Sequence, residues 1–312
     1  MPITWYSTAS LRLDIQQLTL LFDPFAPLPA AGINLHAADF LPAPHILITH
    51  GHLDHLSTVP ALLTLAAPQS LESPDHPGSP QQPETPAVYA SATPCSTLVA
   101  QGVDPAMLNC IKPDDKILFS AVKGAPLTQD AAQESMGTQD FDSPKGSNNP
   151  WSPLTPDVVT VNVRKGRHIR FDARLVLRTL FNPRLLRSLG SSLGLLAMHR
   201  AYPEKGETLI YEVSYADTLL TVMGSLALAE DERYTQNPDL LVLPYQGQTH
   251  LQQPALAVVE KLMPRAVLLD HFDNSFPPIS RTIDPSPFIN LMAQRHPQIR
   301  IIVPQRGVPY TF

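Results

Sequence analysis

The chain has 312 residues, 43% of them hydrophobic, so it can bury a substantial core. A formal net charge of −6 and a sequence pI of about 6.0 argue against a nucleic-acid-binding protein as a whole. No apolar stretch approaches the ~20 residues of a membrane span, and the N-terminus shows no signal peptide. The only two cysteines, Cys95 and Cys110, lack metal-type spacing, which favours a reducing compartment. We therefore expect a soluble cytoplasmic protein with no stable membrane insertion and no nucleic-acid partner.

Short runs of apolar and β-branched residues predict strands through the first half of the chain. These strands are Ile3–Tyr6, Leu11–Ile15, Leu18–Phe22, Ile46–Thr49, Val88–Ala90, Lys116–Phe119 and Val158–Val163. The strand Ile46–Thr49 ends directly at a group of histidines. A helix is expected after this group, capped by Ser57 or Thr58 and with Pro60 in its first turn.

The strand pattern resumes after Pro203. The predicted strands there are Thr208–Val213, Leu219–Met223, Leu240–Leu243 and Ala266–Asp270, and Pro254–Leu262 is predicted to be a helix. Strands interleaved with helices predict an α/β protein with two β-rich halves. Polar residues placed just after strand ends suit a site built on the loops of one sheet edge.

Proline is unusually frequent, with 34 residues, and much of the excess lies in two segments without apolar periodicity. We interpret these segments, at about 70–87 and 124–157, as loop insertions on the globular frame that contribute little to the core. A further segment at about 171–203 has helical character and is apolar and glycine-broken. It is either a cap over the site or a core helix.

The stretch HILITHGHLDHL places His50, His52, Asp54 and His55 within six positions after a buried strand. Imidazoles and a carboxylate suit a divalent ion, with zinc preferred and manganese or iron as alternatives. In an extended turn, His50 and His52 point the same way and can share one ion. Asp54 and His55 would then face a second ion about 3.5–4 Å away, the separation of two-metal hydrolytic sites. A histidine-rich surface loop is the alternative, which the density of ligand types disfavours.

The same stretch resembles the His-x-His-x-Asp-His signature of the metallo-β-lactamase superfamily. Thr4–Ser10 (TWYSTAS) and Phe22–Phe25 (FDPF) resemble the opening strands of the branch that includes L-ascorbate-6-phosphate lactonase. The resemblance implies one α/β domain over residues 1–312 (α+β by some schemes), built as a four-layer αββα sandwich. It also implies two further ligands after strands, His168 in KGRHIRFD and His271 in VLLDHFDN. The implied first site is His50, His52 and His168, and the second is Asp54, His55 and His271.

The sequence departs from this family at Ser225, in LLTVMGSLAL, where the resemblance implies an aspartate that bridges the two ions. This serine has three possible interpretations. The site holds one ion, a water or hydroxide replaces the bridge, or a carboxylate such as Asp270 or Asp273 reaches in. The first two are favoured, because a neighbouring ligand would point to the wrong side of the strand. Gly224 either allows close backbone approach or is an ordinary turn glycine.

Asp23 is interpreted either as a residue that orients the histidine loop or as a turn-initiating Asp-Pro. Asp54 is the candidate catalytic residue, because it can bind metal and orient a metal-activated water. The absence of a GxSxG motif makes covalent catalysis less attractive, so we expect metal-assisted hydrolysis. Arg167, Ser225 and Gln246 are candidate substrate-binding residues.

Nine of the 22 basic residues lie between Arg164 and Arg200, against one acid, Asp172. This bias either draws an anionic substrate, phosphorylated or a lactone, or marks a solvated helix face. The alternatives to a small-molecule hydrolase are a phosphodiesterase acting on lipid or nucleotide substrates and a non-catalytic metal-binding protein. The oligomeric state is left open, including a homo-oligomer.

Overall fold

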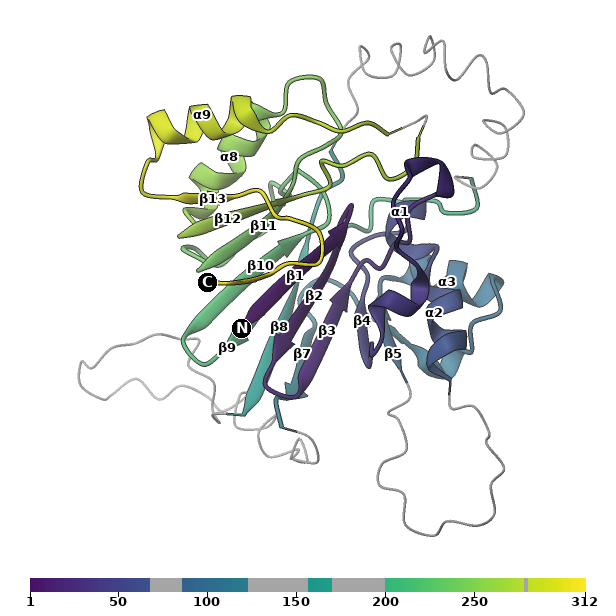
Figure 1. Cartoon of the computed structure of the whole chain (residues 1–312). Coiled ribbons are helices and arrows are strands. Elements are labelled where there is room, and N and C mark those ends of the chain that lie inside the picture. The colour runs from purple at the N-terminus through teal and green to yellow at the C-terminus, as the bar shows by residue number, and fades with distance from the viewer. Residues whose placement is uncertain (68–85, 123–156, 170–199, 278–279) are drawn as a thin grey trace, which may run out of the picture.

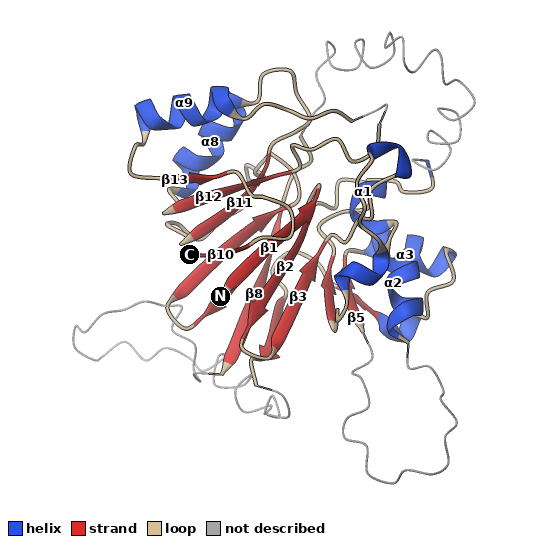
Figure 2. Cartoon of the chain, viewed as in Figure 1, coloured by secondary structure: helices blue, strands red, loops and turns tan. Residues whose placement is uncertain are grey.

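The structure is a computed structural model that describes residues 1–67, 86–122, 157–169, 200–277 and 280–312. These residues form two sheets stacked face to face, with helices on both outer faces (Figures 1 and 2). The insertions expected at about 70–87 and 124–157, and the cap-like segment at about 171–203, lie almost wholly outside the described residues.

The first sheet has seven strands in the order β14-β1-β2-β3-β4-β5-β6. Its strands are β1 (Pro2–Ser7), β2 (Ser10–Ile15), β3 (Leu18–Phe22), β4 (His45–Leu47), β5 (Ala87–Ala90), β6 (Leu108–Cys110) and β14 (Pro309–Thr311). The strands β1 to β3 form an antiparallel meander, and β3 to β6 run parallel. The two ends of the chain are neighbours, because Pro2 in β1 pairs with Thr311 in β14.

The second sheet also has seven strands, in the order β13-β12-β11-β10-β9-β8-β7. Its strands are β7 (Lys116–Ser120), β8 (Val158–Lys165), β9 (Leu209–Tyr215), β10 (Thr218–Met223), β11 (Leu240–Pro244), β12 (Ala266–Asp270) and β13 (Arg300–Ile302). The strands β7 to β10 alternate in direction, and β10 to β13 run parallel. It follows that β8, β10, β11 and β12 end at the same edge of this sheet.

Helices cover the outer face of each sheet (Figure 2). The first sheet carries α1 (Leu53–Leu56), α2 (Val59–Ala66) and α3 (Ala92–Ala100), with the 3-10 turns η1 (Pro29–Ala31), η2 (Ala37–Phe40) and η3 (Pro105–Met107) nearby in the chain. The second sheet carries α8 (Gln252–Leu262) and α9 (Ser286–Arg295). Among the described residues, no helix has the length and apolarity to cross a membrane.

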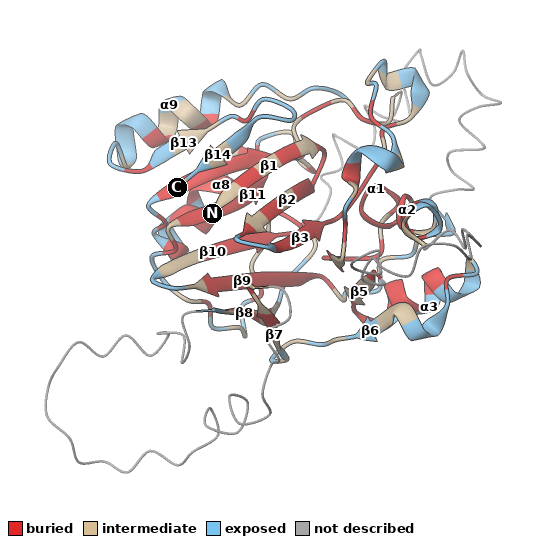
Figure 3. Cartoon of the chain, turned by 60° about the horizontal axis from the view of Figure 1, so that its bottom comes forward, coloured by how far each residue is buried: buried red, intermediate tan, exposed pale blue. Residues whose placement is uncertain are grey.

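Three layers of buried side chains hold the four layers of structure together. Because successive side chains of a strand point to opposite faces, each buried strand contributes to two of these layers. Leu20 and Phe22 of β3 pack between the sheets, whereas Leu21 packs under the helices of the first sheet. In β11, Val242 packs between the sheets and Leu241 packs against α8 and α9. Figure 3 shows the same division, with buried strands inside and helices that are buried on one side only.

This arrangement confirms the predicted αββα sandwich. The predicted side-chain cap of α2 is wrong: Thr58 precedes the helix, but its hydroxyl accepts a hydrogen bond from the Ala26 amide at 2.8 Å instead of capping. A short helix, α1, which the sequence reading did not separate, lies directly before α2 and carries Asp54 and His55.

Candidate metal centre

The six side chains expected to bind metal meet where loops from both sheets come together. His50 follows β4, and His52 precedes α1, whose first turn contains Asp54 and His55. From the second sheet, His168 follows β8 and His271 directly follows β12. The strand directions therefore place residues that are far apart in sequence at one edge of the sandwich.

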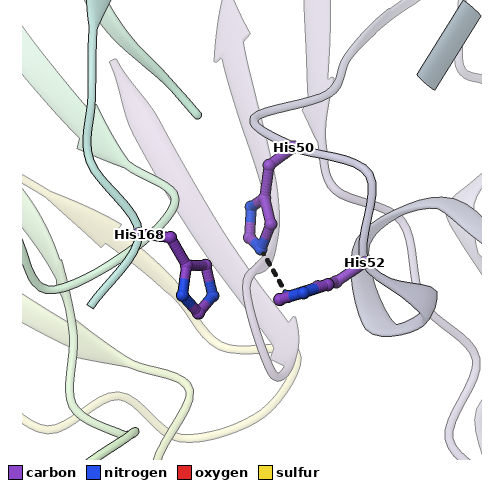
Figure 4. A group of neighbouring side chains, drawn as sticks. All are labelled: His50, His52 and His168. Carbon is purple, nitrogen blue, oxygen red and sulfur yellow. Dashed lines mark hydrogen bonds between the residues drawn. The ribbon is translucent and has the colours of Figure 1, made fainter. Parts of the chain in front are cut away.

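The first group consists of His50, His52 and His168, each of which offers one ring nitrogen within 4.8 Å of the other two. Figure 4 shows the three imidazoles turned toward one another, with Nε2 of His50 and Nδ1 of His52 3.1 Å apart. His50 is buried, and the other two histidines are partly exposed. His50 therefore forms the buried side of this group, and His52 and His168 form the side that solvent reaches.

The second group consists of Asp54, His55 and His271, all buried, with one ligand atom each within 4.8 Å of the others. Oδ2 of Asp54 lies 3.0 Å from Nε2 of His271 and 3.9 Å from Nε2 of His55. The two groups adjoin, since the ring centroids of His50 and His55 are 3.9 Å apart. Their membership coincides with the two ligand sets that the sequence resemblance implies.

Burial and neighbouring charge shift the proton affinities of these side chains. Burial, together with the surrounding imidazoles, holds the pKa of His50 well below its usual value, and burial also lowers the pKa of His168. Burial opposes the charged form of His271 too, but the hydrogen bond and charge of Asp54 outweigh it and raise the pKa of His271 to about 9. Although burial opposes ionisation of Asp54, His55 and His271 hold its pKa well below the usual range. His50 and His168 thus offer neutral ring nitrogens, and the second group offers an ionised carboxylate.

Asp23 links the loop after β3 to the histidine loop. One of its carboxylate oxygens accepts the Thr49 amide at 2.8 Å, and the other accepts the Thr49 hydroxyl at 2.6 Å and contacts Nδ1 of His55 at 2.8 Å. Asp23 is buried and has a left-handed backbone, with φ of 44°. Such a conformation is costly for a residue other than glycine and persists only where its surroundings enforce it.

Two further contacts leave Nε2 of a histidine facing its group. Nδ1 of His271 lies 2.7 Å from the side-chain oxygen of Gln246, and Nδ1 of His168 lies 2.8 Å from the Ile169 carbonyl. An acceptor at Nδ1 holds a proton on that nitrogen, so Nε2 is the nitrogen that would bind an ion. Gln246, which was expected to touch substrate, is therefore a partner of His271, and its role in substrate binding stays a prediction.

The candidates for the bridging position are Ser225, Asp270 and Asp273. The Ser225 hydroxyl accepts the Ile169 amide at 2.9 Å, next to His168. Neither Asp270 nor Asp273 belongs to either ligand group. Asp273 accepts four hydrogen bonds from other residues, and both oxygens of the buried Asp270 have no hydrogen-bond partner among the described residues. The described geometry gives no support to either carboxylate as a replacement bridge.

The predicted basic cluster is only partly described. Arg167 forms an exposed ion pair with Glu230 at 2.9 Å, so its role in substrate binding stays a prediction. Arg164 and Lys165 pair with Glu212 and Asp231, at 2.9 and 2.6 Å. The remaining members before Arg200 lie outside the described residues; they are Arg170, Arg174, Arg178, Arg184 and Arg187.

The sequence reading missed several residues that support the centre. Thr49, immediately before the histidine loop, contacts Asp23 and the Nδ1 atoms of His50 and His55, at 3.1 and 3.3 Å. Gly51 packs against Pro203, where a Cβ atom would lie 2.5 Å from the Pro203 carbonyl oxygen. Two of these residues could have been found from the sequence: Thr49 is a polar residue at the end of a predicted apolar strand, and Gly51 lies inside the histidine motif. Nothing in the sequence pointed to Pro203.

No protein-family model matches the chain. Parts of it are similar to proteins described as UPF0173 metal-dependent hydrolases. The one from Roseobacter denitrificans is 43% identical over 75 residues, which is 24% of this chain and 31% of that protein. The one from Xanthobacter autotrophicus is 33% identical over 103 residues, 33% of this chain and 37% of that protein. The chain thus matches about a third of the length of these relatives.

Solved structures match over nearly the whole chain at low identity. Igni18, a metallo hydrolase from Ignicoccus hospitalis, has a TM-score of 0.54 and 14% identity, covering 100% of this chain and 97% of that one. YhfI from Bacillus subtilis, a metallo-beta-lactamase fold protein, has a TM-score of 0.54 and 10% identity, covering 99% of each chain. The chain therefore has the metallo-β-lactamase fold, and its resemblance to metal-dependent hydrolases is confirmed. The ascorbate-6-phosphate lactonase branch stays a prediction.

Proposed function

We propose that this chain is a metal-dependent hydrolase in which His50, His52 and His168 hold one divalent ion, and Asp54, His55 and His271 hold a second. The observation that carries the proposal is the pair of adjoining three-residue groups, each within 4.8 Å, at one edge of the sandwich. The similarity to metal-dependent hydrolases supports the same conclusion.

The donor set fits zinc, and it also accommodates manganese or iron. Three imidazoles form the first group, and two imidazoles with a carboxylate form the second. Because Ser225 supplies no bridging carboxylate, the first ion is held more tightly than the second. One or two ions per chain are therefore expected, with the occupancy of the second depending on the supply of metal.

A divalent ion in such a site acts as a Lewis acid and activates water at neutral pH. Asp54 is the proposed catalytic residue, because its carboxylate belongs to the second group, which adjoins the first, and can both bind metal and orient the attacking water. Asp23 positions His55 through Nδ1, and Gln246 does the same for His271. Removing such partners of a ligand weakens metal affinity about 10- to 100-fold in comparable sites.

We infer that the substrate is a small anion and that it approaches from the side of His52 and His168, the partly exposed ligands. A groove of about 560 Å³ lies between α3 and residues 200–205, and Arg200 and Lys205 line it. Among the described residues, neither cation forms a hydrogen bond or a close ion pair with a carboxylate, although the charge of Lys205 helps to lower the pKa of Glu207. Pro203, which also lines the groove, packs against Gly51 of the histidine loop. Cations beside a metal centre favour a phosphorylated substrate or a lactone that opens to a carboxylate.

Two other functions would be supported by other results of the assay for hydrolysis. A phosphodiesterase acting on lipids or nucleotides would use the same metal chemistry, and a non-catalytic metal-binding protein would explain the serine at position 225. A single domain over residues 1–312 and a cytoplasmic location also stay predictions.

Hydrolysis of a lactone panel and of bis(p-nitrophenyl) phosphate, measured with zinc, manganese or iron supplied after chelation, tests the proposal. We expect metal-restored turnover of an anionic substrate, reduced about 100-fold or more in Asp54→Asn. The control is His296→Ala, since His296 pairs with Glu260 on the surface. Turnover of the phosphodiester alone selects the phosphodiesterase. Bound metal without turnover of either class selects the non-catalytic protein.

A further inference from the structure

His271 has a backbone that requires external support. It directly follows β12 and has φ of 58°, in the left-handed region that residues with a side chain rarely adopt. Its amide donates to the Thr8 carbonyl at 2.8 Å, across the gap between the two sheets. Thr8 lies in the turn between β1 and β2 and is itself left-handed, with φ of 46°. This hydrogen bond therefore joins two residues, Thr8 and His271, whose left-handed backbones both need support from their surroundings.

Asp273 holds Thr8 at a second point, and we call the two contacts of Thr8, with His271 and with Asp273, the clamp. The Thr8 amide donates to one carboxylate oxygen of Asp273 at 3.0 Å, while the Thr8 carbonyl accepts the His271 amide. Both backbone groups of Thr8 are thus bound to the segment that carries the metal ligand. The Thr8 carbonyl also accepts the Trp5 indole at 2.8 Å, which fixes the turn from the other side.

The Asp273 carboxylate has no acceptor site to spare for a metal ion. Besides Thr8, it accepts the Ser275 hydroxyl at 2.8 Å, the Ser7 hydroxyl at 2.7 Å and the Arg306 guanidinium at 3.1 Å. Four donors match the capacity of an ionised carboxylate. Arg306 also lies over the Trp5 ring, 5.5 Å from its centroid, so the segment after β13 joins the same cluster.

We propose that Asp273 is a positioning residue for the second metal ion: it holds Thr8 in its left-handed turn, and Thr8 in turn fixes the backbone of His271. This inference rests on the proposed function for the metal, although the clamp itself does not. His271 is the only ligand of the second group supplied by the second sheet, so a shift of its backbone would open that group and leave the first group intact.

The test compares Asp273→Ala and Asp273→Asn with the matched control Asp239→Ala. Asp239 accepts the Leu219 amide and the Arg265 guanidinium, both at 2.8 Å, so it has the same kinds of partner as Asp273. It lies before β11, at the opposite end of the sheet from the ligands. Asparagine at position 273 keeps one oxygen for the Thr8 amide and removes the charge.

The first measurement needs no metal. Hydrogen exchange followed by mass spectrometry on the metal-free chain should show faster exchange around Thr8 and His271 in Asp273→Ala, with little change in Asp273→Asn and none in Asp239→Ala. Unchanged exchange at both residues in Asp273→Ala would overturn the clamp, whatever the metal content.

The second measurement is a chelator-competition titration with zinc. We expect Asp273→Ala to weaken the second ion about 10- to 100-fold and leave the first unchanged. Asp273→Asn should keep most of the affinity for the second ion. This variant still tests the proposal if Asp273→Ala fails to fold. Equal losses in Asp273→Asn and Asp273→Ala would show that charge matters and not the clamp, which overturns the proposal. If the native chain takes up no second ion, the two-ion function fails, and hydrogen exchange still decides on the clamp.

Discussion

Gly224, directly after β10, meets Thr49, two residues after β4, so closely that a Cβ atom on the glycine would lie 2.2 Å from the Thr49 hydroxyl oxygen. The Thr49 carbonyl also accepts the Leu209 amide at 2.7 Å, so this threonine joins the two sheets. Its hydroxyl is the one that donates to Asp23 beside His55. The close approach of the two sheet edges therefore depends on glycine.

Replacing Gly224 with alanine should displace Thr49 and disturb the metal centre. Overpacking of this kind costs about 1–3 kcal/mol, because a buried backbone must move. We expect Gly224→Ala to lower the free energy of unfolding in urea and to reduce bound zinc. Gly166→Ala is the control, since a Cβ atom there would be 3.1 Å from Thr208, a far milder contact. Equal effects of the two substitutions on bound zinc would contradict this role for Gly224.

Ser225→Asp should increase the amount of metal held per chain. A carboxylate at this position would place a negative charge between two cations and strengthen the second site. Ser225→Ala, which leaves the buried Ile169 amide without its acceptor, should give no such gain and should cost about 1–3 kcal/mol of stability. Elemental analysis after identical dialysis measures the outcome. Two tightly held ions in the native protein, one of them expelled by Ser225→Asp, would mean that another group already fills the bridge.

Glu207 should stabilise the groove beside the metal loop in a pH-dependent way. Partial burial disfavours its charged form, but hydrogen bonds from the Thr93 amide and hydroxyl outweigh this and lower the pKa of Glu207. A lowered pKa contributes stability above the unfolded value of 4.5, which is lost as the pH falls through the folded value. The melting temperature of Glu207→Gln should therefore fall below that of the native protein at pH 7, and the two should converge in acid. A difference that stays constant with pH would contradict this.

Much of the fold could be predicted because its central strands are buried on both faces. Leu240–Leu243 is apolar without interruption and Leu18–Phe22 is interrupted only by Thr19, and each run matches an observed strand. The strands β6, β13 and β14 were not predicted, because three residues are too few to show a periodic pattern. The helices α3 and α9 were not predicted either. In α3, the sequence ATPCSTLVA contains residues of low helix propensity, and tertiary packing of its buried face overrides them.

The candidate site, like the fold, could be predicted from the sequence only in part. His50 to His55 could be recognised from local spacing, whereas His168 and His271 depended on the resemblance to a family. Asp273 could not be found from sequence, because its contact with Thr8 spans 265 positions and depends on left-handed backbone at residues other than glycine. Such conformations leave no compositional signal, so only the packing of the two sheets reveals them.

The most direct test of the metal centre is elemental analysis of three variants, His168→Ala, His271→Ala and His296→Ala, after loading with zinc and identical dialysis. We expect His168→Ala to lose the tightly held ion. His271→Ala should keep that ion and lose only the weaker one, and His296→Ala should match the native protein. Native zinc content in both His168→Ala and His271→Ala, or no retained zinc in the native protein, would contradict the proposed centre.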